Sequence, residues 1–84
     1  MVTVVITIEA AKEIKSLPRS MKGRIDDLLG SLMKWPNVSG AKPLRGKLKG
    51  HFRKRTGTFR VIFRVEGDRL IVVKAGNRKD VYEG

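Results

Sequence analysis

The chain has 84 residues, 40% of them hydrophobic and 32% charged, and it contains no cysteine. This composition predicts one folded domain over residues 1–84, and it excludes a disulfide framework and a thiolate metal site. The formal net charge is +11 and the longest apolar run near the N-terminus is only Val4-Val5-Ile6, so we expect a cytoplasmic protein that has a polyanionic partner and no membrane association.

The first half of the chain predicts a strand and two helices. Residues 2–8 are nearly all β-branched and indicate an opening strand. A first helix is expected over residues 9–17, with Thr7 as its cap and Pro18 at its end, and a second helix over residues 20–34. The apolar positions of the second helix follow the spacing of a single buried stripe, namely Met21, Ile25, Leu28, Leu29 and Leu32. The two helices form an antiparallel hairpin.

The second half predicts a β-meander. A loop rich in Asn, Ser, Gly and Pro covers residues 37–43, and a short extra strand is possible over residues 44–48. Three further strands are expected at residues 50–55, 58–66 and 69–75. The turns Thr56-Gly57 and Gly67-Asp68 are short enough to make neighbouring strands antiparallel. The expected fold class is α+β: an N-terminal strand, a two-helix antiparallel hairpin and an antiparallel β-meander of three to four strands, with the helices on one sheet face.

Basic residues dominate the middle of the chain. No acidic residue occurs between Leu28 and Val65. Because successive strand side chains point to opposite faces, Phe59 and Phe63 share one face and Arg60 and Arg64 share the other. If the aromatic residues mark the core side, the guanidinium groups gather on the far side of the sheet. The residues expected there are Arg53, Arg55, Arg60 and Arg64.

Most enzyme classes lack the residues that they need. His51 is the only histidine, the acidic residues occur mostly in predicted helices and turns, and no glycine-rich phosphate loop precedes a helix. We therefore expect no metal and no cofactor. Cleavage of RNA by its own 2′-hydroxyl needs only alignment, charge stabilisation at phosphate and two proton transfers. Arginine suits the second task, because its planar group binds phosphate in a bidentate manner, but it cannot act as the base.

Several short motifs occur together in one order. They are the stretches "LRGKLKGHFRKRTGTFRVIFRV" and "VVKAGNRKDVYEG", which hold a Leu-x-Gly, a basic strand after an aromatic, a Gly-x-Phe-Arg strand, a Gly-x-Arg turn and a terminal tyrosine. With the preceding strand and helices, the chain resembles the RelE/ParE superfamily of type II toxin–antitoxin toxins, in its RelE-like branch. The resemblance implies the RelE-like microbial RNase fold and a metal-free, ribosome-dependent mRNA endonuclease that cuts in the A site and inhibits translation.

The resemblance also implies which residues act. Arg53 and Arg55 fall at the basic strand positions, Arg60 at the phosphate-binding arginine, Arg78 at an arginine implicated as acid or charge stabiliser, and Tyr82 at the C-terminal tyrosine. RelE itself has lysines at the two strand positions, which weakens a lysine-as-base role in this chain. Tyr82 becomes the leading base candidate, because surrounding arginines would lower the pKa of its phenol. His51 is the reserve.

The remaining basic residues are assigned to nucleic-acid or ribosome binding. They are Lys42, Arg45, Lys47, Lys49, His51, Lys54 and Arg64. The expected partners are the 70S ribosome, mRNA and a cognate antitoxin, partly disordered, whose acidic amphipathic segment wraps a monomeric toxin. Two other functions stay open: a ParE-type inhibitor of DNA gyrase without nuclease activity, and a nucleic-acid-binding accessory protein or translational regulator without toxicity. Residues 53–55 can also be read as a docking patch for nucleic acid or the ribosome that has no catalytic role.

Overall fold

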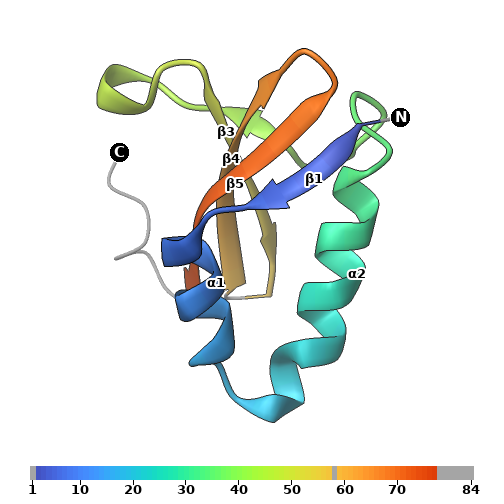
Figure 1. The fold of residues 1–84 in the computed structure, drawn as a ribbon, viewed down its shortest axis with the longest axis vertical. Coiled ribbons are helices and arrows are strands. Elements are labelled where there is room, and N and C mark those ends of the chain that lie inside the picture. The colour runs from blue at the N-terminus through green and yellow to red at the C-terminus, as the bar shows by residue number, and fades with distance from the viewer. Residues whose placement is uncertain (1, 58, 78–84) are drawn as a thin grey trace.

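The computed structural model describes residues 2–57 and 59–77. The elements in chain order are β1 (Thr3–Ile6), α1 (Ile8–Lys15), the 3₁₀ turn η1 (Arg19–Met21), α2 (Lys22–Leu32), β2 (Lys42–Pro43), the 3₁₀ turn η2 (Gly46–Leu48), β3 (His51–Thr56), β4 (Phe59–Glu66) and β5 (Arg69–Asn77). In Figure 1, α1 and α2 run in opposite directions, which confirms the predicted hairpin. None of the helices in these residues is long and apolar enough to cross a lipid bilayer.

The strands of the described residues form one mixed sheet in the order β1-β5-β4-β3-β2. β3, β4 and β5 are antiparallel neighbours, as the short turns predict, and β2 pairs with β3 in the same sense. β1 pairs in parallel with β5, from Thr3 opposite Arg69 to Ile6 opposite Val72. The first strand of the chain therefore lies beside the last, and the predicted α+β architecture is confirmed.

The core lies between the helices and one face of the sheet. The buried residues of α2 are Ile25, Leu28 and Leu32. They cluster with the fully buried side chains of Phe59, Val61 and Phe63 from β4. The other two members of the predicted stripe, Met21 in η1 and Leu29, are partly buried and pack against the core. Trp35, just beyond α2, packs its ring edge against Phe52 and Phe63, with ring centroids 4.8 and 5.5 Å apart. The aromatic residues thus mark the core side, as expected.

Element boundaries differ from the prediction for local reasons. Thr7 caps α1, accepting a hydrogen bond at its Oγ1 from the Ala10 amide at 3.2 Å, so the helix begins at Ile8 and the strand ends earlier. The predicted second helix is divided into η1 and α2. The extra strand suggested at residues 44–48 was wrong: the pairing strand is the two-residue β2, and residues 46–48 form η2. Gly46, at the start of η2, has a positive φ of 68°, which takes the chain out of the extended conformation.

One contact joins α1 to the last strand. β1 pairs with β5 only as far as Val72, where the Thr7 amide donates to the Val72 carbonyl. Beyond that point α1 lies along β5. The Ala75 amide donates to the Glu13 Oε1 at 2.9 Å, and Ala75 is fully buried. A helix side chain therefore supplies the acceptor that the shorter β1 does not provide.

Replacing Glu13 by alanine is expected to lower the free energy of unfolding by about 1–3 kcal/mol, because the buried Ala75 amide loses a charged acceptor. Urea denaturation measures this change. Glu13→Gln keeps a carbonyl acceptor and should cost clearly less. Equal losses in both variants would show that the negative charge of Glu13, and not this hydrogen bond, carries the effect.

Candidate nucleic-acid interface

The far face of the sheet carries a cluster of basic side chains. In the register of β3 and β4, Arg55 is opposite Arg60, Arg53 is opposite Ile62 and His51 is opposite Arg64. Phe59, Val61 and Phe63 alternate with these β4 positions and point into the core. Arg53, Arg55, Arg60 and Arg64 therefore share one side of the sheet, which we call the arginine face.

A lysine that the sequence did not reveal also lies on this face. The register of β4 and β5 shifts between Ile62 and Phe63, because Phe63 is opposite Val72 while Ile62 is opposite Lys74. Val73 is thus an extra residue, a β-bulge. Strict alternation from the buried Leu70 would point Lys74 into the core, and the bulge turns it to the arginine face instead. A bulge leaves no clear mark in this sequence.

The arginine face has an apolar floor. Ile62 is completely buried although it shares this face with the arginines, and Ile71 and Leu44 are each 8% exposed. None of the three belongs to the helix-side core cluster. The Leu44 amide donates to the His51 carbonyl at 2.9 Å, which continues the pairing of β2 along β3. Charged groups above a dry floor interact more strongly with an anion than they would in water.

Two buried nitrogens on the arginine face have no hydrogen-bond partner within residues 2–57 and 59–77. They are the Nε of Arg60 and the Nδ1 of His51. A buried polar atom without a partner costs free energy, so such atoms often mark places where a ligand binds. Arg60 lies opposite Gly76, which has no side chain. His51 lies opposite Arg64, four residues along β4 from Arg60, or roughly 13 Å at the rise of a strand.

Two predicted binding residues have internal partners. Arg64 donates from its Nε to the Glu66 Oε2 at 2.7 Å. Glu66 directly follows the stretch from residue 28 to 65 that has no acidic residue. Its carboxylate therefore neutralises the positive charge at this end of the arginine face. Lys54 lies on the helix side, opposite Val61, and its Nζ donates to the Ser39 carbonyl. Alternation within β3 thus separates Lys54 from Arg53 and Arg55, as expected.

The other predicted residues fall outside the centre of the face. Lys42 is opposite Arg53 in the sheet, while Arg45, Lys47 and Lys49 are exposed in the loop around η2. Figure 1 shows this loop projecting from the sheet away from α2. Arg78 and Tyr82 lie outside the described residues, so their roles stay predictions. Within residues 2–57 and 59–77, no three histidine or acidic side chains are grouped in a way that suits a metal ion.

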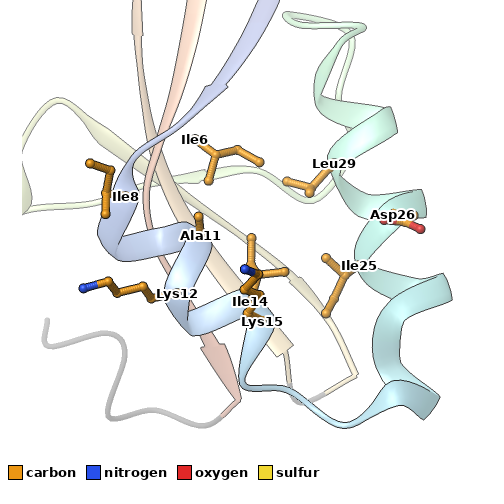
Figure 2. Close-up of a pocket in the computed structure, with 9 residues that line it drawn as sticks. All are labelled: Ile6, Ile8, Ala11, Lys12, Ile14, Lys15, Ile25, Asp26 and Leu29. Atoms are coloured by element: carbon orange, nitrogen blue, oxygen red, sulfur yellow. The ribbon is translucent and has the colours of Figure 1, made fainter.

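An apolar groove lies elsewhere, between α1 and α2 (Figure 2). Its volume is about 330 Å³, and its walls include Ile6, Ile8, Ile14, Ile25 and Leu29. Ile8 is 77% exposed and Ile6 is 37% exposed, which is unusual for isoleucine. Ile8 was expected at the end of the opening strand, whereas it begins α1, and the groove was not predicted. The cap at Thr7 was the signal that Ile8 begins a helix, with its side chain on the open side.

No family model matches the chain. The chain is, however, 31% identical over 83 residues to Toxin RelG of Mycobacterium tuberculosis (strain ATCC 25618 / H37Rv), an alignment that covers 95% of this chain and 94% of that toxin. The chain belongs to the RelE-like toxin superfamily. It is a toxin of a toxin–antitoxin module, as the motifs around residues 44–63 and 76–82 had suggested.

Solved structures agree with this assignment at the level of the fold. The RelE-like chain superimposes on a chain of the RelBE2 toxin–antitoxin complex of Mycobacterium tuberculosis with a TM-score of 0.80, at 24% identity, over 92% of this chain and 98% of that one. For the isolated Escherichia coli RelE toxin, the TM-score is 0.77 at 17% identity, over 93% and 85% of the two chains.

The buried Nε of Arg60, which has no hydrogen-bond partner among the described residues, is expected to lower the free energy of unfolding of this toxin. Arg60→Met keeps the apolar stem and removes both the charge and the buried nitrogen. We expect the free energy of unfolding to rise by about 1 kcal/mol, as measured by urea denaturation. Arg19→Met, at an exposed position in η1, is the control for the loss of one charge. A variant at Arg60 that is less stable than this control would contradict the prediction.

Proposed function

We propose that this toxin is a ribosome-dependent endoribonuclease that cuts mRNA in the A site and so inhibits translation. The observation that carries the proposal is the buried, unpaired Nε of Arg60 on the arginine face. Arg55 lies opposite Arg60, and neither guanidinium has a hydrogen bond or ion pair with another described residue. A phosphate is the ligand that best satisfies two such groups at once.

The proposed reaction uses the RNA's own nucleophile. The 2′-oxygen attacks the adjacent phosphorus, the bond from phosphorus to the 5′-oxygen breaks, and a 2′,3′-cyclic phosphate is left on the upstream fragment. A base takes the 2′-hydroxyl proton and an acid returns one to the leaving oxygen. Charge builds on the phosphate oxygens as the phosphorus becomes five-coordinate, and Arg60 is suited to stabilise it. This step requires no metal ion.

The base must be another residue, since arginine stays protonated. His51 lies roughly 13 Å along the sheet from Arg60, at the spacing of four strand residues, so it is better suited to a neighbouring nucleotide than to the same phosphate. Tyr82 therefore remains the leading candidate for the base, and Arg78 for the acid or a second stabiliser. The ribosome would hold the codon in line for attack, which is the entropic part of the barrier. We propose that the toxin acts in the cytoplasm, where translating ribosomes are found.

Arg60→Ala is expected to reduce mRNA cleavage on ribosomes by about 10²–10³-fold or more, because one preformed stabiliser of the transition state is lost. Mapping of mRNA 5′ ends after brief expression measures the cleavage and its codon position. Arg19→Ala removes the same charge at an exposed position in η1, outside the arginine face, and should cut normally. Unchanged cleavage by Arg60→Ala would overturn the proposal, and inhibition of purified gyrase without ribosomes would favour the alternative function.

The partner that neutralises the toxin is an antitoxin, and we propose that part of it occupies the groove between the two helices. The groove exposes isoleucine side chains, and Lys12 and Lys15 line it together with Asp26 (Figure 2). An amphipathic segment with apolar side chains on one face and acidic ones beside them fits this surface. Further acidic residues of the antitoxin would cover the arginine face of the toxin. This would explain how a protein of charge +11 is held inactive.

Ile8→Ser is expected to weaken antitoxin binding at least several-fold, because an exposed apolar anchor is lost, while ribosome-dependent cleavage stays unchanged. Titration calorimetry with the cognate antitoxin measures the affinity. Met33→Ser is the matched control, since Met33 is 45% exposed and lies outside the groove. If both variants bind the antitoxin as the unmodified toxin does, the groove is not part of the interface.

A further inference from the structure

A second basic site lies where α2 passes the end of β3, and it has its own pocket. The pocket has a volume of about 250 Å³, and its lining includes Arg24, Asp27 and Ser31 from α2 and Lys54, Arg55 and Thr56 from β3. Three cationic side chains and one carboxylate therefore meet there. Arg24 was not among the binding residues expected from the sequence, because the helical pattern of α2 does not show which strand lies beside Arg24.

The three cations are held by different parts of the fold. Lys54 is fixed by its bond to the Ser39 carbonyl, which leaves two of its ammonium protons for another acceptor. Arg24 reaches the turn between β3 and β4: its Nη1 is 3.1 Å from where a Cβ on Gly57 would stand. Arg24 and Arg55 have no hydrogen bond or ion pair with any described residue. Their donors are available to a ligand.

The pocket is continuous with the arginine face. Arg55 lines the pocket and is also the register partner of Arg60. β2 pairs with β3 only up to Arg53, so within the described residues the outer edge of β3 carries no strand at Arg55. A chain of anionic groups can pass around this bare edge, from the arginine face on one side to Arg24 and Lys54 on the other, without meeting another element of the sheet.

We infer that this pocket binds a phosphodiester group of RNA next to the one at Arg60. The inference rests on the proposed function in taking RNA as the ligand of the arginine face. The ligand class follows from the donors, because two guanidinium groups and an ammonium ion suit phosphate oxygens. Asp27 opposes an anion and limits the affinity, and Ser31 contributes no donor since its hydroxyl already binds the Leu28 carbonyl at 2.6 Å. The site therefore adds to RNA binding and carries no role in catalysis.

The test measures binding of the full chain to a short single-stranded RNA whose 2′-O-methyl groups prevent cleavage, at several salt concentrations. Arg24→Gln should weaken binding several-fold at low salt and reduce the salt-dependence slope by about 0.7, the value for one phosphate contact on a single strand. Arg19→Gln removes the same charge outside the pocket and should alter the slope less. Asp27→Asn should tighten binding more than Asp26→Asn, whose side chain lines the apolar groove instead.

A second arm uses vacant 70S ribosomes without mRNA, which separates the two sources of phosphate. A selective loss for Arg24→Gln with the oligonucleotide assigns the phosphate to the substrate strand, and a loss confined to vacant ribosomes assigns it to ribosomal RNA; both support the site. Equal behaviour of Arg24→Gln and Arg19→Gln in both arms overturns it. Both arms measure binding and not cleavage, so they would still test this site if the toxin proved not to be a nuclease.

Discussion

The structure depends on a sheet whose two faces have opposite chemistry. On one face, Phe59, Val61 and Phe63 bury completely against the helices. On the other, the same strands carry four arginines that repel one another. The core side must supply enough apolar burial to hold the basic side together. Alternation along β3 and β4 makes this coupling unavoidable, since a shift of one residue in register would exchange the faces of a whole strand.

The charge of the basic face is only partly neutralised within the described residues. Glu66 pairs with Arg64 at one end, whereas the buried Nε of Arg60 has no hydrogen-bond partner among the residues that the structure describes. A ligand that binds such a group only in the folded state also stabilises that state. The apolar groove on the helix side is separate from this face. The fold thus carries two chemically different surfaces, one apolar between α1 and α2 and one basic on the far side of the sheet.

The sequence predicted what depends on local pattern. The stripe on α2, the cap at Thr7 and the alternation that gathers Arg53, Arg55 and Arg60 all follow from side-chain period and short-range hydrogen bonding. What escaped prediction depends on tertiary structure. The bulge at Val73 turns Lys74 to the basic face, Arg24 reaches the β3–β4 turn from a helix, and Ile8 is exposed because α1 begins one residue earlier than expected. Each needs the position of a second element, which periodicity does not contain.

The parallel pairing of β1 with β5 affects when the protein can fold during its synthesis. β1, at one edge of the sheet, is the first strand to be synthesised, and β5, with which it pairs among the described residues, is the last. β1 cannot pair in the sheet until residues 69–72 of β5 have left the ribosome. Contacts between residues so distant along the chain also form slowly. The sheet is therefore completed only after β5 has been synthesised, so the toxin reaches its folded form late in the translation of its own mRNA.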